Sequence, residues 1–439
     1  MDQQQNTVLK LSNNILEALK WIDSQQNFLV KHLITWSEIN SGSTNYTGLN
    51  KQANAIFNLF KDKLASNLTN DYKYTSQIIP LKNITPKQTY NIQDNTPTGP
   101  IIIFEKKLIK KTDKKTPQII LTGHYDTVFS EKHKFQKTSK KHADILQGPG
   151  VADMKGGILV MLTAVMAFEK FNNNNNNNNN NINWKIILNP DEEIGSPASR
   201  KYLENAAKDA NKNNGVGLVY EPSATPDGCL AGARPGSGAY KVTAHGKSAH
   251  AGRDLFNGKN AIIALSEVAM KIHKLSKPNQ SLLINIARFN ADSPLNQVPD
   301  LAYFTLNIRA KNKELQDYFE QKLDLITKEV AHKTGCKINY TGSFSRPPKP
   351  LDKNQLKLFN LAKQCGQALN LQIKWKSVGG VCDGNNLAAS GIPVLDTLGV
   401  RGGLIHTDQE YMHLNSLTER AKLSTLLLFK LAENKIKNS

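Results

Sequence analysis

The sequence predicts an α/β domain that is interrupted by a smaller ferredoxin-like α+β insert. Up to about residue 220, short β-branched runs alternate with helical patterns, which is typical of a largely parallel sheet covered by helices. From Gly238 onward the predicted elements follow the order β-α-β-β-α-β, which is the order of a ferredoxin-like sandwich. The chain has 439 residues, of which 39% are hydrophobic. That length is sufficient for roughly two to three domains with a sizeable core.

The first third of the chain contains helices followed by two strands. Apolar residues recur at helical spacing over residues 7–36 and again over residues 49–68. The β-branched runs PIIIFE (100–105) and PQIILT (117–122) predict two neighbouring strands. The segment KKLIKKTDKK between them is expected to be a charged connection.

The α/β pattern continues beyond the second strand. An apolar helix is expected at 156–171, and buried strands at 184–188 and 216–220. Ten consecutive asparagines, residues 172–181, separate the helix from the next strand. A polar low-complexity run of this kind cannot bury a core, so we interpret it as a loop expansion.

The insert alternates between strand and helix patterns. Its expected elements are a strand in GAYKVTAHG, a helix at 260–275, strands in SLLINIARFN and LAYFTLNIRA, a helix at 313–334 and a strand at 337–341. The proline-rich segment RPPKP (346–350) ends it, and helices are expected again at 354–368 and 417–434. We therefore assign residues 1–232 and 347–439 to the α/β domain and residues 233–346 to the insert.

Composition excludes several classes of protein. No segment has the roughly 20 consecutive apolar residues that a membrane span needs, and the start lacks the basic and apolar regions of a secretory signal. The four scattered cysteines form no CxxC pair, so reduced thiols and a cytoplasmic location are expected.

The net charge is +19, but only eight of the 56 basic residues are arginine. The basic stretches 106–115 and 132–141 lack the interleaved aromatics that stack on bases, so a nucleic-acid partner is not expected.

Five segments place carboxylates or histidines where a strand meets a loop, next to glycines. Open α/β sheets bind ligands at the carboxyl ends of their strands. Each segment alone has a simpler interpretation: Asp153, for example, precedes an apolar helix and could be only its N-cap. The candidates are His124 and Asp126 in GHYDTV, Asp153 in GPGVADMKGG, Glu192 and Glu193 in NPDEEIGS, Glu221 in YEPS and His406 in GGLIHTDQEY.

Together these residue types indicate a metal site. Adjacent acids repel one another, so in a cleft they need a cation, and one acid can bind the metal while its neighbour titrates as a base. Imidazole and carboxylate ligands without cysteine suit zinc or another borderline divalent ion. Asp126 could lie behind His124 and fix its tautomer.

These motifs, together with GKSAHAG, resemble the co-catalytic di-zinc aminoacyl hydrolases: glutamate carboxypeptidase, acetylornithine deacetylase and succinyl-diaminopimelate desuccinylase. The resemblance extends from about residue 34 to the C-terminal helix, and the segments at 233–253 and 379–400 are most similar to the glutamate carboxypeptidase branch. It implies a zinc-dependent exopeptidase-like catalytic domain with an inserted ferredoxin-like dimerisation domain. The implied cofactors are two Zn²⁺ per chain, with Co²⁺ or Mn²⁺ as possible substitutes.

The resemblance also implies a role for each motif residue. Asp153 would bridge two ions, and the peptide bond after it is cis in relatives. The second histidine near the C-terminus, His413, lacks the Gly-Gly-x-x-His spacing, which favours His406. The implied roles are His124 and Glu221 as ligands of one ion, Glu193 and His406 as ligands of the other, Glu192 as general base and acid, and Asp126 as the residue that orients His124.

The resemblance further implies a homodimer that is formed by the insert. His250 matches the histidine that polarises the scissile carbonyl from the partner subunit, and Asn296 and Arg309 match positions that hold the substrate's α-carboxylate. The expected substrate is a small peptide or N-acyl amino acid with a free α-carboxylate, with a linked glutamate as the leading candidate. The alternative is an N-acyl amino acid deacylase of the acetylornithine or desuccinylase type. A catalytically inactive basic protein that binds nucleic acid, or a pure scaffold, remains as an alternative outside the enzymes.

Overall fold

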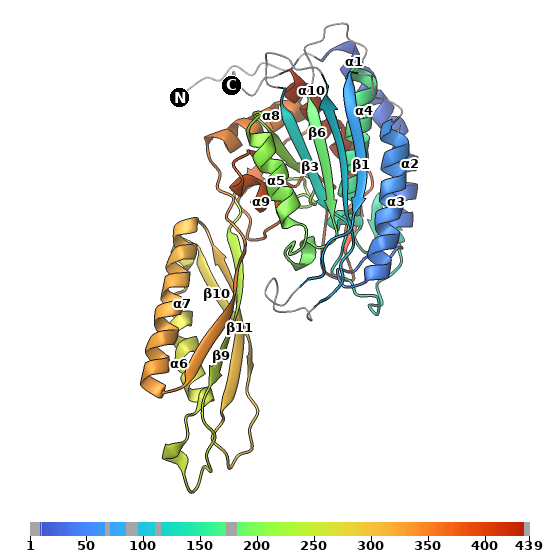
Figure 1. Cartoon of the computed structure of the whole chain (residues 1–439). Helices are drawn as coiled ribbons and strands as arrows, with labels where there is room; N and C mark the ends of the chain where they lie inside the picture. The colour runs from blue at the N-terminus through green and yellow to red at the C-terminus, as the bar shows by residue number, and fades with distance from the viewer. Residues whose placement is uncertain are drawn as a thin grey trace.

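The computed structural model describes residues 9, 11–65, 71–84, 95–109, 116–172 and 182–433. Figure 1 shows two units: an α/β unit built around a central sheet, and an elongated α+β unit with its own sheet and helices. The second unit begins with β9 (Gly236–His245) and ends with β12 (Lys337–Arg346). This architecture confirms the predicted fold class.

The central sheet has six strands in the order β1-β2-β6-β3-β7-β14. The four strands from β6 to β14 run parallel, whereas β1 and β2 are antiparallel to their neighbours. The prediction of a parallel sheet therefore holds for four of the six strands. The strands are β1 (Tyr72–Ile79), β2 (Ile101–Leu108), β3 (Gln118–His124), β6 (Asn183–Asn189), β7 (Val216–Val219) and β14 (Val394–Leu395).

The prediction that the strands at 100–105 and 117–122 are neighbours is wrong. β6 lies between β2 and β3, pairing antiparallel with β2 and parallel with β3. The helix α4 (Gly156–Asn172) supplies the crossover that a parallel β3–β6 pair requires. Strand adjacency is a long-range property, so two strands that follow each other in sequence need not pair.

Helices cover both faces of this sheet because its buried strands are apolar on both sides. In β3, Ile119 and Leu121 join the larger core with α4, while Ile120 joins a smaller core on the opposite face. The predicted helical region 7–36 is two helices that meet at Gln25. The helices of the larger core are α1 (Asn13–Ser24), α2 (Gln26–Ser37), α3 (Tyr46–Ala65), α4, α8 (Lys353–Ala368) and α10 (Ser416–Ala432); those of the smaller core are α5 (Arg200–Asn211) and α9 (Asp383–Ala389).

The α4 helix is the most apolar element and lies inside the α/β unit. Among the described residues, one helical segment, Val151–Asn172, is long and apolar enough to cross a membrane, and the most apolar 18-residue stretch within it is completely buried in the protein. It is therefore a core helix, as the sequence predicts. Asn172 ends α4, and the rest of the asparagine run, 173–181, lies outside the described residues.

The second unit is a four-stranded antiparallel sheet with two helices on one face. Its strand order is β10-β11-β9-β12, the ferredoxin-like order, and it has a core of its own. Asn260 and Asn312 cap the two helices by accepting backbone N–H groups. β12 extends to Arg346, five residues beyond the predicted end. The remaining elements are α6 (Ala261–His273), β10 (Leu282–Asn290), β11 (Leu301–Ala310) and α7 (Lys313–Thr334).

A small sheet that the sequence did not predict connects distant segments of the α/β unit. Its order is β15-β16-β5-β4, and every pair within it is antiparallel. It brings the segment after residue 400 against the glycine-rich segment before α4. The strands are β4 (Ser139–His142), β5 (Ile145–Gln147), β15 (Gly402–Gly403) and β16 (Tyr411–His413).

A glycine sets the distance between α4 and the end of β7. A Cβ atom at Gly157 would lie 2.0 Å from the backbone oxygen of Tyr220. Because a backbone atom cannot move aside cheaply, only glycine permits this approach. The contact brings Asp153, just before α4, close to Glu221, just after β7.

We predict that Gly157→Ala destabilises the protein by about 1–3 kcal/mol, because the added methyl group would push α4 away from β7. The shift of the urea-unfolding midpoint measures this effect. Gly379→Ala is the matched control, since a Cβ there meets nothing within 4 Å. Equal midpoints for the two variants would contradict the packing argument.

Candidate active site

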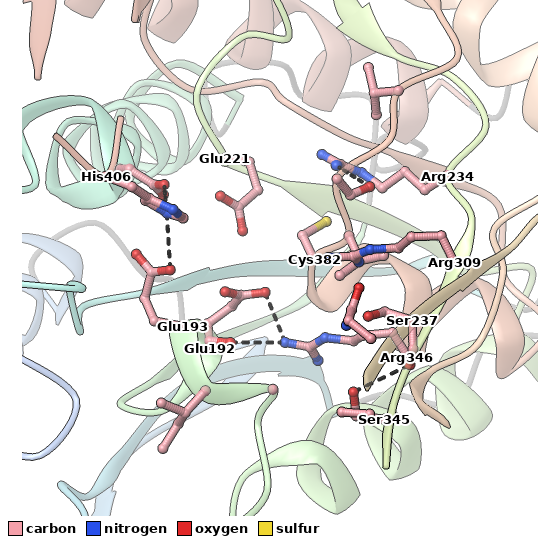
Figure 2. A pocket seen from close by; sticks show the side chains of 18 of the residues that line it. Glu192, Glu193, Glu221, Arg234, Ser237, Arg309, Ser345, Arg346, Cys382 and His406 are labelled. Carbon is pink, nitrogen blue, oxygen red and sulfur yellow. Dashed lines mark hydrogen bonds and ion pairs between the residues drawn. The ribbon is translucent and has the colours of Figure 1, made fainter. Parts of the chain in front are cut away.

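The candidate residues gather at the carboxyl ends of three adjacent parallel strands. His124 is the last residue of β3, Glu221 follows β7, and the acidic pair Glu192 and Glu193 follows β6. Because these strands are neighbours in the sheet, their ends open into one region. Figure 2 shows Glu192, Glu193, Glu221 and His406 around one side of the resulting pocket.

Five of the predicted residues form two groups that share Asp153. One group is His124, Asp153 and Glu221, and the other is Asp153, Glu193 and His406; within each, one potential ligand atom per residue lies within 4.8 Å of the others. His124 Nε2 is 3.2 Å from Asp153 Oδ1 and 3.7 Å from Glu221 Oε2. His406 Nε2 is 3.3 Å from Asp153 Oδ2 and 3.2 Å from Glu193 Oε2. The two oxygens of Asp153 thus face different histidines.

Asp126 lies directly behind His124 and is completely buried. Its Oδ1 is 3.2 Å from His124 Nδ1, the ring nitrogen that faces away from Asp153. It also accepts the backbone N–H groups of Glu192 and Glu193, at 3.1 and 3.2 Å, and the Ser43 hydroxyl at 2.8 Å. Asp126 therefore orients the imidazole and the acidic loop together.

Burial disfavours the charged forms of these acids and raises their pKa values. Burial raises the pKa of Glu193 to about 7, and the charge of Asp153 adds to the effect. It also raises the pKa of Glu221, and that of Glu192 well above its ordinary value. Hydrogen bonds with Asp153 and Glu193 raise the pKa of His406 to about 11. The glutamate shifts arise first from desolvation, and the His406 shift from the acids that contact it.

The donor sets fit a pair of divalent ions. Each group combines one imidazole nitrogen with carboxylate oxygens, and one carboxylate could bridge the two. Cations there would compensate the charge that the protein concentrates in this place. The chemistry of the donors favours zinc or another borderline metal over magnesium or calcium, which prefer oxygen alone.

Glu192 belongs to neither group and points to a buried arginine instead. Arg346 Nη2 is 2.8 Å from Glu192 Oε1, and Arg346 Nη1 is 2.5 Å from Asp383 Oδ1. Figure 2 shows Arg346 reaching toward the acidic pair from β12. Arg346 is 1% exposed, so it fixes the direction of the Glu192 carboxylate from the end of the second unit.

A cavity of about 600 Å³ extends from these residues to the sheet of the second unit. Two further arginines line it. Arg234 forms a two-pronged ion pair with Asp396, at 2.5 and 3.1 Å. Arg309 Nη1 is buried without a hydrogen-bond partner among the residues that the structure describes. Arg309 is thus the lining guanidinium with capacity left for a ligand carboxylate.

His250 and Asn296 do not join the cavity of their own chain. Both are exposed in two loops of the second unit, between β9 and α6 and between β10 and β11. Backbone hydrogen bonds hold the loops together, including Ala251 N–H to the Asn296 carbonyl at 2.8 Å. Of the three predicted substrate-binding residues, only Arg309 lines the cavity.

Four buried polar residues beside the acidic cluster were not identified from the sequence: Ser43, Arg346, Asp383 and Glu410. All act across long sequence separations. Arg346 appears in the sequence only as the first residue of the proline-rich RPPKP segment, and Glu410 as part of the segment after His406. Neither pattern indicates which side chain it will meet.

The fold and this paired His/carboxylate centre define a metal-dependent hydrolase of the peptidase type. The comparison with known families agrees: peptidase family M20/M25/M40 matches residues 120–430. The chain belongs to this family and is a metallopeptidase-type hydrolase.

Several relatives are similar along most of their length. Carboxypeptidase G2 from Pseudomonas sp. (strain RS-16) is 25% identical over 323 residues, which cover 72% of this chain and 74% of the relative. Succinyl-diaminopimelate desuccinylase from Blochmanniella pennsylvanica is 23% identical over 358 residues, covering 77% and 88%. The crystal structure of aminopeptidase PepT from Bacillus cereus superposes with a TM-score of 0.67 at 18% identity, covering 93% and 99%. That last likeness supports the fold.

We predict that Arg346→Met destabilises the protein by about 3–5 kcal/mol, because it leaves Glu192 and Asp383 buried without their cation. Chemical unfolding would measure the loss. The double variant Arg346→Met with Asp383→Asn is expected to recover part of it. Additive effects of the two substitutions would contradict a direct coupling.

Proposed function

We propose that the protein is a di-zinc hydrolase that cleaves an amide or peptide bond next to a residue with a free α-carboxylate. The observation that carries this proposal is the placement of two His/carboxylate groups, joined by Asp153, beside Glu192 in one cavity. In this proposal, His124 and Glu221 would hold one ion, Glu193 and His406 would hold the other, and Asp153 would be shared by both groups. Residues 1–232 and 347–439 form the catalytic domain, and residues 233–346 form the dimerisation domain.

The two ions would supply Lewis acidity, which lowers the pKa of a bound water from about 15.7 toward 7 and polarises the amide carbonyl. Glu192 acts as the general base and takes the proton of the attacking water on its carboxylate. The same carboxyl then donates that proton to the nitrogen of the leaving amine. Arg346 holds Glu192 in place during both transfers, and Asp126 keeps His124 in one orientation.

Arg309 is proposed to bind the substrate's α-carboxylate. Its guanidinium lines the cavity and retains an unpaired, buried Nη1. A planar guanidinium can bind a carboxylate through two parallel hydrogen bonds. The distance between this anchor and the acidic cluster would then select which bond of the substrate reaches Glu192.

A homodimer is proposed to complete the site. His250 and Asn296 are exposed on the outer loops of the second unit, next to the strongly exposed apolar residues Phe256 (98%) and Leu295 (104%). Such a surface is typical of a contact with another chain. We propose that these loops reach the cavity of a partner subunit, where His250 stabilises the oxyanion and Asn296 helps to hold the carboxylate.

The leading substrate class is a peptide or acyl conjugate with a C-terminal glutamate, in line with the similarity to carboxypeptidase G2. The similarity to succinyl-diaminopimelate desuccinylases supports the alternative, an N-acyl amino acid deacylase. Kinetics on N-acetylornithine and N-succinyl-diaminopimelate against α- and γ-linked glutamyl conjugates would separate the two. A cytoplasmic location stays a prediction.

Metal content and chelator-sensitive hydrolysis test the proposal. About two zinc ions per chain, with hydrolysis that stops on chelation and returns with Zn²⁺, would support it. Absence of both metal binding and hydrolysis after zinc is added back would reject it. Salt-dependent retention on DNA would then support the alternative of an inactive nucleic-acid-binding protein.

We predict that Glu192→Ala abolishes turnover while both ions stay bound, because Glu192 lies outside the two ligand groups. Asp153→Ala is the matched comparison and should lose metal as well as activity, since both groups share Asp153. Elemental analysis and hydrolysis assays of the two purified variants check these outcomes. Turnover by Glu192→Ala at the unmodified protein's rate would contradict the role of Glu192.

We predict that His250→Ala lowers kcat by about 10²–10³-fold, because one oxyanion donor is lost. Co-expression of the His250→Ala and Glu192→Ala variants tests whether His250 acts in the active site of its own subunit or in that of the partner subunit. In a mixed dimer, one site combines an intact Glu192 with the partner's intact His250. For random pairing in a two-fold dimer, about a quarter of the unmodified activity should return. No recovery in mixed dimers would show that His250 does not act across the interface.

A further inference from the structure

A buried carboxylate, Glu410, lies beside the metal-binding groups without belonging to either. Glu410 is 1% exposed and immediately precedes β16 in the sequence. Three backbone N–H groups donate to it: Gly150 to Oε2 at 3.0 Å, and Ala152 and Asp153 to Oε1 at 2.9 and 3.0 Å. A carboxylate that accepts three amides is a strong, directional anchor.

These amides belong to an irregular turn that leads into α4. Asp153 (φ −113°, ψ 91°) and Met154 (φ −136°, ψ 36°) are not helical, and Gly150 before them is left-handed with φ +71°. N–H groups in a buried irregular turn have no regular backbone partner and need an acceptor from elsewhere. Glu410 accepts three of them, from a segment about 260 residues away in sequence.

The same segment carries His406. The Glu410 backbone carbonyl accepts Gly148 N–H at 3.1 Å, and β16 pairs with β5. Within the segment, Glu410 N–H donates to the Thr407 carbonyl at 3.2 Å. Residues 404–409 are exposed, whereas Glu410 is buried. Glu410 therefore attaches the loop that carries His406 to the interior of the protein. One side chain therefore fixes Asp153 relative to His406.

We propose that Glu410 is a positioning residue that sets the affinity for the ion held by Asp153, Glu193 and His406. This inference rests on the proposed di-zinc function. The other group depends less on Glu410, because His124 and Glu221 are fixed by the ends of β3 and β7 and by Asp126. Loss of Glu410 would thus weaken one of the two metal equivalents selectively.

Stepwise metal titration tests this inference. The purified full-length protein is stripped with a chelator and titrated with Zn²⁺ by calorimetry, and with Co²⁺ by absorbance. For Glu410→Ala, one equivalent should bind about 10–100-fold more weakly than in the unmodified protein, the usual effect of losing an outer-sphere partner of a metal ligand. Glu410→Gln loses one of the three hydrogen bonds and should weaken the same equivalent by a smaller factor. Hydrolysis should be low at limiting metal and return at excess metal. His406→Ala identifies which equivalent is affected.

Asp408→Asn is the matched control, since it removes a charge from an exposed side chain of the same loop. It should bind both equivalents as the unmodified protein does. Unchanged affinities in both Glu410 variants, or equal weakening of both equivalents, would overturn the inference. If Glu410→Ala does not fold, Glu410→Gln decides: its oxygen can keep the bonds to Ala152 and Asp153, whereas its NH2 group cannot accept Gly150 N–H, so a selective weakening of the same equivalent is still expected. Failure of the unmodified protein to bind metal would instead reject the proposed function.

Discussion

The structure depends on one electrostatic constraint: four carboxylates, Asp153, Glu192, Glu193 and Glu221, line one buried cavity. Such groups repel one another, and burial increases the repulsion because water no longer screens it. Arg346 compensates part of the charge, on the side of Glu192. The other carboxylates of the cluster need cations. His124 and His406 face these carboxylates, so each histidine would share a cation with them. Stability and metal binding are therefore expected to depend on each other.

The backbone supplies the geometry that this constraint requires. Three parallel strands end side by side, so residues from distant parts of the sequence meet at one edge of the sheet. Gly157 lets α4 approach the end of β7, and Asp126 fixes the acidic loop through two backbone N–H groups. The loops that carry the proposed metal ligands are thus held in part by side-chain carboxylates that accept their backbone N–H groups.

The sequence was informative where the relevant signal is local. Apolar residues at helical spacing, β-branched runs and alternating patterns predicted most helices and strands, and short motifs at strand ends predicted the residues that lie in two groups around Asp153. It failed where the signal is long-range. Nothing in the runs at 100–105 and 117–122 indicates that β6 will lie between them. Likewise, no pattern around Arg346 or Glu410 indicates that each will meet a loop more than 150 residues away.

The position of Arg346 connects the two units chemically. It is the last residue of β12, so its backbone moves with the sheet of the second unit, while its guanidinium contacts Glu192 and Asp383 in the first. Arg309, on strand β11 of the same sheet, lines the same cavity. Binding of a carboxylate at Arg309 and the placement of Glu192 therefore depend on the orientation of one rigid sheet. A substrate that aligns this sheet would also align Glu192, the proposed general base, so that substrate binding and catalytic geometry would be coupled through the second unit.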